Sequence, residues 1–485
     1  MSERPKPSIF VNYLYSIIYI LSGILFPLLT FPYAARVMQA EGIGIVGHYQ
    51  SVASYISILV SLGIPLYGIK EIAKTKNEIE RSRSLIEILL LHLIMDVVAI
   101  VIVALLVIFG NVDNVGLFLL MNSYIVINTI GCEWLYKGIE DFKYISIRNI
   151  IVRALAVLFL FSFVKQKDDV FQYAIYILIS TAGGNFWNFY RIRKYLVWNK
   201  DFYRNICISR HIKIIIRVFP IHIALSSFPV LSIAILGIVG KNEEVGYYVA
   251  ATKFVMFIVV VVGALSHVLL PRLSGLYERK EKAEFNRLCA KSLDSLFATC
   301  PLVCVLIIIS APELISLFCG SNFFPSVLTL RLISPVVISL TLVKMIAMEI
   351  LYPQNHEIFL SVVMTFGVVL EVLVSLSLYK YYGHNGFAIG LVLSNLLTIM
   401  LFFIFKRDKI PFRFQSVHVR YLVVTFLIFF ICEFIHEIIN IPALLKVSFV
   451  FMVGAGLYLL ILRLMKDAIV VELQQKMMAM LKRWC

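Results

Sequence analysis

Charged residues are scarce in this sequence. Only 15% of its 485 residues are Asp, Glu, Lys or Arg, whereas about a quarter of a soluble globular chain is charged. Hydrophobic residues make up 60%, and no polar stretch between the apolar runs is long enough to form a soluble domain. The composition therefore excludes a water-soluble globular fold and indicates a single membrane domain.

Motifs for hydrolysis and for metal binding are also missing. The sequence contains no Walker A, HExxH or GxSxG motif, so we do not expect this chain to drive its function by hydrolysis. Its eight cysteines form no CxxC pair, and Cys300 and Cys304 have no neighbouring histidine. We interpret them as small apolar residues of a helix bundle. We therefore expect no metal, no cofactor and no enzymatic activity.

Long apolar runs recur from one end of the chain to the other. A helix needs about 20 predominantly apolar residues to cross the hydrocarbon core of a bilayer, which is about 30 Å thick. We predict an all-α membrane protein with about fourteen transmembrane helices. The predicted spans are 8–33, 45–67, 84–109, 116–137, 144–164, 171–191, 213–238, 247–270, 291–310, 326–350, 357–379, 386–405, 418–438 and 443–463.

Lysine and arginine are distributed unevenly among the loops. The loops after predicted helices 2, 6, 8 and 12 and the C-terminal tail are rich in both residues, whereas 111–115, 240–246 and 311–325 contain only Lys241. Because positive charge in short loops marks the cytoplasmic side, this alternation predicts that both termini are cytoplasmic. It also accounts for most of the net charge of +15, so we expect no nucleic-acid partner.

A short internal duplication relates the two halves of the chain. Val46–Tyr55 resembles Val245–Phe254, and each segment opens a helix that runs from the outside to the inside. Parallel repeats of this kind are a transporter architecture. We predict two six-helix lobes around a central cavity, at 1–200 and 201–410, followed by two further helices and an amphipathic cytoplasmic tail at 411–485.

Several ionisable residues lie within or at the ends of the predicted spans. A charge at a helix centre costs about 2.5–3.5 kcal/mol on insertion scales, so such a residue faces a cavity or a partner. Cations suit a phosphate-bearing substrate, whereas carboxylates could carry protons or a counter-ion. The candidates are Lys253, Arg153, Arg148, Arg36 and Lys344 for substrate binding, and Asp96, Glu349, Glu371 and Glu41 for ion coupling. For each of these residues the alternative is snorkelling to the interface or a structural ion pair, as it is for Glu133 at the end of the fourth predicted span.

A set of segments between Phe31 and Ser274 carries a family resemblance. The segments are Phe31–Arg36, Glu41–Gly44, Tyr49–Ser51, Glu71–Lys74, Glu133–Arg148, Val245–Lys253 and Leu270–Ser274. In combination they resemble the polysaccharide repeat-unit flippases of the multidrug/oligosaccharidyl-lipid/polysaccharide exporter superfamily. Beyond Ser274 the chain matches that family in helix pattern only.

The resemblance implies a specific function and location. It implies a protein of the bacterial inner membrane that moves undecaprenyl-pyrophosphate-linked oligosaccharides from the cytoplasmic to the outer leaflet by alternating access. It also implies that Lys253 meets the pyrophosphate, whereas the role of Arg36 is open between a gate and an anion contact. The expected partners are this lipid-linked substrate, membrane lipids and a polysaccharide polymerase or export machinery.

Three other functions stay open at this point. A lipid II flippase and a multidrug cation antiporter belong to the same superfamily, although the antiporter would typically have twelve helices and an acidic cavity. A membrane-embedded polysaccharide polymerase or acyltransferase belongs to a different class. Such enzymes usually need a long outer loop or paired catalytic residues, and the longest predicted outer loop here is only 311–325.

Overall fold

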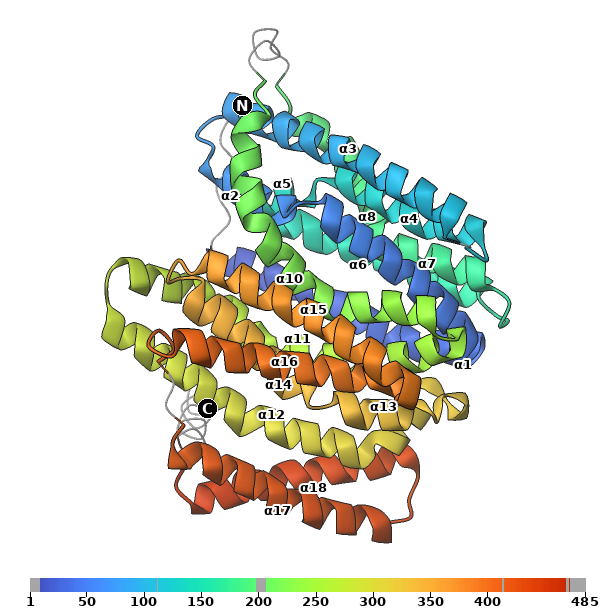
Figure 1. Ribbon diagram of the computed structural model, residues 1–485, viewed down its shortest axis with the longest axis vertical. Coiled ribbons are helices and arrows are strands. Elements are labelled where there is room, and N and C mark those ends of the chain that lie inside the picture. Colours follow the sequence, from blue (N-terminus) through green and yellow to red (C-terminus); the bar gives the residue numbers. More distant parts are fainter. Residues whose placement is uncertain (1–8, 111, 198–205, 412–413, 468–470, 472–485) are drawn as a thin grey trace, which may run out of the picture. The chain divides into compact units, whose positions relative to one another are not determined.

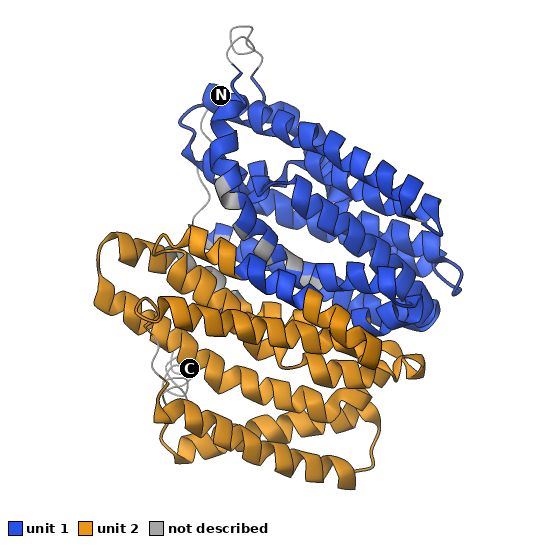
Figure 2. Cartoon of the chain, in the orientation of Figure 1, with its two compact units in different colours: residues 1–249, 364–372 blue, residues 250–363, 373–485 orange. Residues whose placement is uncertain are grey.

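The computed structural model describes residues 9–110, 112–197, 206–411, 414–467 and 471 (Figure 1). Over these residues the regular elements are all helices, which confirms the predicted fold class. The chain divides into two compact units (Figure 2). Unit 1 comprises residues 1–249 and 364–372, and unit 2 comprises residues 250–363 and 373–485. The division at 200 and 410 predicted from the internal duplication stays a prediction.

The helices agree with the predicted number of spans. Eleven segments of the described chain are long and apolar enough to cross a membrane. One of them, Leu14–Val60, has 47 residues and covers two predicted spans. The shorter apolar helices Val170–Ala182 and Val230–Val239 fall within the sixth and seventh predicted spans. Each of the fourteen predicted spans therefore has a helical counterpart.

Unit 1 is built around its first helix, which packs against α4, α6 and α10, while α3 and α4 also lie side by side (Figure 1). The helices of unit 1 are α1 (Ile9–Val60), α2 (Ile64–Lys74), α3 (Glu78–Phe109), α4 (Val115–Gly131), α5 (Glu133–Gly138), α6 (Phe142–Phe163), α7 (Val170–Ala182), α8 (Gly184–Ile192) and α10 (Ser209–Val239), with a 3₁₀ turn at Arg193–Tyr195 and the start of α11 (Asn242–Glu278).

Local sequence explains several of the helix boundaries in unit 1. The backbone of α1 leaves helical geometry at Gln39, with φ 57° and ψ −174°, which separates its two spans. After α1, Gly63 takes a positive φ of 79°, a conformation that glycine adopts readily. Asn77 and Asn114 cap α3 and α4, because their side-chain oxygens accept hydrogen bonds from free backbone N–H groups of the first turns.

A buried carboxylate joins α3 to the segment that begins α10. Glu87 has no exposed side-chain surface. It accepts hydrogen bonds from Arg83 of its own helix (3.0 Å) and from the backbone N–H of Cys207 (2.8 Å). Arg210 lies 2.5 Å from it, and Nε2 of His211 lies 2.8 Å from it. The carboxylate is therefore surrounded by donors that come from two distant parts of the sequence.

Unit 2 is centred on α12, which packs against α13, α14, α17 and α18. Its helices are the remainder of α11, then α12 (Lys282–Cys319), α13 (Ser326–Ile333), α14 (Val336–Met345), a π-helical turn at Ile346–Leu351, α15 (Glu357–Tyr382), α16 (His384–Lys406), α17 (Ser416–Ile438) and α18 (Ala443–Leu464), with a 3₁₀ turn at Ser321–Phe323 and residues 364–372 of α15 assigned to unit 1.

The two last helices are tied to α12 by an ion pair. Glu313 of α12 contacts His436 of α17 at 2.9 Å and Lys446 of α18 at 3.1 Å. The presence of α17 and α18 agrees with the expectation that two further helices follow the twelfth span. Residues 468–470 and 472–485, which make up most of the predicted amphipathic tail, lie outside the described residues.

Candidate functional site

A row of polar contacts follows α1 along its interface with neighbouring helices. The contact residues on α1 run from Tyr15 to Tyr33, a distance of roughly 27 Å at 1.5 Å per residue. Polar groups within a bilayer need such partners because lipid offers none. The contacts are Ser146 to the carbonyl of Tyr15 (2.6 Å), Tyr19 to Glu133 (2.5 Å), Arg153 to Ser22 (2.5 Å), Thr30 with Tyr176 (2.5 Å) and Tyr33 to the carbonyl of Val164 (2.7 Å).

Glu133 is the centre of the most highly charged part of this row. Its carboxylate accepts a hydrogen bond from Tyr19, and it pairs with Lys137 at 3.0 Å and with Arg148 at 3.1 Å. The residue before it, Cys132, has a left-handed backbone conformation that separates α4 from α5. Glu133 therefore lies in the first turn of a new helix, where the helix dipole favours a negative charge.

Two arginines of α6 complete the group. Arg148 is only 3% exposed and, besides Glu133, contacts the side chain of Asn149 at 2.6 Å. Arg153 is half-buried and donates to Ser22, one turn of α1 beyond Tyr19. We call Tyr19, Glu133, Lys137, Arg148 and Arg153 the basic cluster.

Both guanidinium groups of the basic cluster lie close to a glycine, and one of these glycines makes room for its arginine. A Cβ atom at Gly184 of α8 would lie 2.7 Å from Nε of Arg148, so a larger residue there would displace the guanidinium. A Cβ atom at Gly23 would lie 3.5 Å from the guanidinium of Arg153, an ordinary van der Waals distance, so this guanidinium lies against α1 but does not depend on the glycine. The two arginines are thus held close to their neighbouring helices.

The basic cluster has an excess of positive charge. It contains three cations and one carboxylate, and that carboxylate already pairs with two of the cations. The side chain of Lys137 is 30% exposed and Arg153 is half-buried, whereas Arg148 is almost completely enclosed. An incoming anion could therefore contact Lys137 and Arg153, while Arg148 holds Glu133 in place. Such an arrangement suits a phosphate group.

The structure brings together two of the predicted cations and adds residues that the sequence analysis did not single out. Arg148 and Arg153 both lie on α6, where Arg148 contacts Glu133 and Arg153 contacts Ser22 of α1. Lys137 follows Glu133 by four residues, and this spacing was a usable signal for an ion pair on a helix. Tyr19 comes from a distant helix, and nothing in its local sequence marks it.

The other three predicted cations lie elsewhere. Arg36 is exposed on α1, and its guanidinium lies 3.5 Å from the carbonyl of Pro32. Lys253 is exposed on α11, and Lys344 is half-buried in α14; both belong to unit 2. Their role in substrate binding stays a prediction.

Three of the predicted carboxylates are buried and accept hydrogen bonds from hydroxyl groups. These three pairs are Asp96 with Thr129 (2.9 Å), Glu349 with Ser292 (2.9 Å) and Glu371 with Ser232. The described residues supply no partner for the second carboxylate oxygen of Asp96. His92, four residues earlier on α3, is equally buried. The role of these carboxylates in ion coupling stays a prediction.

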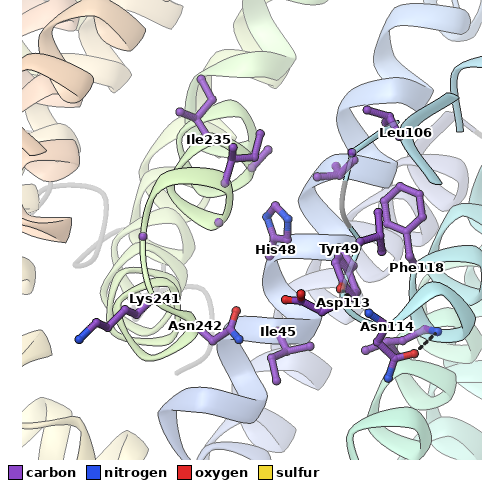
Figure 3. Close-up of a pocket in the computed structure, with 18 of the residues that line it drawn as sticks. Ile45, His48, Tyr49, Leu106, Asp113, Asn114, Phe118, Ile235, Lys241 and Asn242 are labelled. Atoms are coloured by element: carbon purple, nitrogen blue, oxygen red, sulfur yellow. Dashed lines mark hydrogen bonds between the residues drawn. The ribbon is translucent and has the colours of Figure 1, made fainter. Parts of the chain in front are cut away.

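The fourth predicted carboxylate, Glu41, lines a cavity of about 1160 Å³ in unit 1 (Figure 3). Its walls come from α1, from α3, α4 and the segment that joins them, from the start of α7, from α10 and from the first residues of α11. Two loops that were predicted to lie outside, 111–115 and 240–246, both contribute to it. Segments far apart in the sequence but assigned to one side of the membrane therefore meet at one cavity.

Beside this cavity α1 and the start of α11 approach each other closely at two glycines, Gly44 just before the first copy of the internal duplication and Gly246 within the second copy. A Cβ atom at Gly44 would lie 1.7 Å from the carbonyl oxygen of Asn242, and one at Gly246 would lie 1.9 Å from that of Ala40. Gly246 occupies the position in the second copy that Gly47 occupies in the first. We call this contact between α1 and α11 the repeat crossing. Only residues without a side chain allow backbones to approach so closely.

Comparisons with known proteins agree with this architecture. A family model described as "Polysaccharide biosynthesis protein" matches residues 9–277, and one described as "Lipid II flippase MurJ" matches residues 210–455. A sequence from Shigella dysenteriae named as an O-antigen transporter is 23% identical over 387 residues, which is 78% of this chain and 94% of the relative. A sequence of the same name from Escherichia coli K12 is 24% identical over 398 residues, covering 80% and 94%.

Solved structures share the fold. A lipid II flippase MurJ in an inward closed conformation superposes with a TM-score of 0.64 at 12% identity, covering 93% of this chain and 98% of that structure. An inward-facing multidrug resistance transporter of the MATE family gives a TM-score of 0.58 at 14% identity, covering 81% and 98%. Because the first family model alone matches more than half of the chain, the protein belongs to the polysaccharide biosynthesis protein family, among the flippases of the multidrug/oligosaccharidyl-lipid/polysaccharide exporter superfamily.

Proposed function

We propose that this protein is a flippase for lipid-linked oligosaccharides in surface polysaccharide synthesis. Its substrate is an oligosaccharide repeat unit on undecaprenyl pyrophosphate, which it moves from the cytoplasmic to the outer leaflet of the bacterial inner membrane. The observation that carries the proposal is the basic cluster, which has three cations and one carboxylate, and in which that carboxylate pairs with two of the cations. The family and the names of the two relatives support it.

The basic cluster suggests how the headgroup is held. Lys137 and Arg153 retain accessible surface and bind the pyrophosphate oxygens. The polyprenyl chain stays in lipid, so only the polar part of the substrate crosses through the protein by alternating access. Lys253, which belongs to unit 2, is a separate candidate for contact with the pyrophosphate, as the family resemblance implies.

The orientation in the membrane and the partner proteins are also part of the proposal. The alternation of basic and non-basic loops supports cytoplasmic termini. A polymerase or export machinery is a proposed partner, because the flipped repeat unit must be consumed on the outer side.

A lipid II flippase is the second candidate function. The observations that favour it are the MurJ family model over residues 210–455 and the TM-score of 0.64. Both substrates carry a pyrophosphate, so the basic cluster suits either of them. Depletion of the protein separates the two functions, because loss of a lipid II flippase stops cell-wall synthesis, whereas loss of a repeat-unit flippase removes only a surface glycan.

The proposal predicts a strong effect of removing the accessible cations. In proteoliposomes with an undecaprenyl-pyrophosphate oligosaccharide, we expect Lys137→Ala/Arg153→Ala to lower the initial rate of flipping at least about tenfold. The reason is that each charge-assisted hydrogen bond to phosphate contributes roughly 1.5–3 kcal/mol. The rate is measured as the glycan that becomes accessible to an external lectin.

The matched control is Lys143→Ala, which removes an exposed lysine from the first turn of α6 outside the cluster. This variant should flip at the wild-type rate. Wild-type rates in the double variant, with equal amounts of protein in the vesicles, would rule out the basic cluster as the headgroup site.

A further inference from the structure

The cavity of Figure 3 has the opposite charge character to the basic cluster. Three carboxylates line it, those of Glu41, Asp113 and Glu243, against a single lysine, Lys241. In the close-up the ammonium group of Lys241 is directed away from Asp113 and His48 (Figure 3). Unit 1 thus contains one site with an excess of cations and another with an excess of carboxylates.

The remaining polar lining consists of amide and aromatic side chains. Asn114 and Asn242 lie on opposite sides of the cavity, on the α3–α4 connection and at the start of α11 (Figure 3). Tyr49 of α1 has its ring centroid 5.3 Å from that of His48 and 5.5 Å from that of Phe118. These contacts fix a set of aromatic rings in the wall, next to the carboxylates.

The volume indicates the size of the occupant. Typical pockets for small molecules measure about 300–1,000 Å³, and this cavity has about 1160 Å³. Pockets of this kind owe their specificity to a few polar groups placed on a largely apolar wall. The cavity is therefore large enough for a short chain of linked rings.

The chemistry of the lining selects among possible occupants. Ionised carboxylates only accept hydrogen bonds, so they pair with hydroxyl and amine groups of a ligand. Like charges repel, and the repulsion is stronger in a protein cavity than in bulk water. A pyrophosphate or an acidic sugar is disfavoured beside Glu41, Asp113 and Glu243. Sugar rings also present apolar C–H faces, which can pack against the tyrosine and histidine rings.

We infer that this cavity is a second binding site, which takes the glycan part of the substrate and prefers neutral or amine-bearing sugars over acidic ones. The inference rests on the proposed flippase function and adds a specificity to it. The basic cluster holds the pyrophosphate, and the acidic cavity receives hydroxyl-rich or amine-bearing sugars and repels the pyrophosphate. A repeat unit rich in uronic acids is a poor substrate under this arrangement.

Soluble oligosaccharides test the site without the lipid. The full chain is reconstituted in zwitterionic nanodiscs and titrated calorimetrically with a glucosamine tetramer, an N-acetylglucosamine tetramer and a galacturonic acid tetramer. We expect the amine-bearing tetramer to bind most tightly, the neutral one to bind more weakly and the acidic one to show no measurable binding. Glu41→Gln/Asp113→Asn/Glu243→Gln should weaken binding of the glucosamine tetramer at least about tenfold.

Two further variants keep this test decisive. Asp168→Asn removes an exposed carboxylate that does not line the cavity, and it should leave the affinity unchanged. Asp113→Asn alone affects an exposed side chain and should weaken binding even if the triple variant fails to fold. Equal or tighter binding of the acidic tetramer, unchanged affinity in the Asp113 variant or no binding of any tetramer would overturn the inference.

The outcome is separate from that of the flipping assay. None of the three tetramers carries a pyrophosphate, so their binding does not depend on Lys137 or Arg153. If the protein flips its lipid-linked substrate but binds no tetramer, the proposed flippase function holds and the proposed glycan site is wrong. If the protein binds the tetramers but does not flip the lipid-linked substrate, the proposed flippase function is wrong.

Discussion

Replacing Gly44 with alanine is expected to disrupt the repeat crossing and to stop transport. The added methyl group would lie 1.7 Å from the carbonyl oxygen of Asn242, which is backbone and cannot rotate away. Overpacking of a close contact typically costs about 1–3 kcal/mol. Because α1 and α11 must move apart to relieve the overlap, we expect loss of flipping together with a lower free energy of unfolding, measured on purified protein in detergent.

Gly456→Ala is the matched control for the Gly44 variant. Gly456 lies in α18, and no other atom would come within 4 Å of an added Cβ. Alanine is better than glycine in a helix by about 1 kcal/mol, so this variant should be as stable as the wild type or slightly more stable. If Gly44→Ala were as stable and as active in flipping as this control, the backbones of α1 and α11 would not approach each other closely at the repeat crossing.

Replacing Glu133 with glutamine is expected to produce the largest loss of stability. The change leaves Arg148, which is 3% exposed, without its carboxylate partner, and it also removes the partner of Lys137. Removing one member of a buried ion pair costs about 3–5 kcal/mol. Since the side chain of Glu133 is 26% exposed, we expect a value near the lower end of that range, measured by chemical unfolding in detergent.

A double replacement shows whether the loss of stability comes from the broken pair with Arg148 or from other contacts of Glu133. Glu133→Gln/Arg148→Met should be more stable than Glu133→Gln alone, because no buried charge is then left unpaired. Glu140→Gln, at an exposed residue shortly after α5, serves as the control and should unfold like the wild type. A double variant no more stable than the single one would show that Glu133 acts through contacts other than Arg148.

The number of membrane spans could be predicted from the sequence because its physical cause is local. A run of about 20 apolar residues is sufficient to cross the bilayer, whatever the rest of the chain does. A break between the predicted spans 8–33 and 45–67 was expected, but its position at Gln39 could not be predicted, because glutamine is a good helix former and has no special backbone preference. The break lies next to the repeat crossing at Ala40, which is a tertiary contact.

The candidate sites show the same limit. The cost of a charge in lipid marked Arg148 and Arg153 as functional candidates. The same argument could not name Tyr19 or Ser22, because their roles depend on contacts of α1 with Glu133 of α5 and Arg153 of α6. The cavity could not be predicted at all, because the only feature of its loops that could be recognised in the sequence was their lack of basic residues. Which loops meet depends on the packing of four separate segments.

The buried carboxylate between α3 and α10 has a consequence for how the protein is made. During synthesis Glu87 emerges with Arg83, well before Cys207, Arg210 and His211. A chain that stops at residue 200 would keep only one of these partners for a carboxylate that must be enclosed. We expect such a fragment to be degraded rapidly in a pulse–chase experiment, and co-expression of residues 201–485 to prolong its lifetime. The connection before α10 thus completes the assembly of the helices made before it.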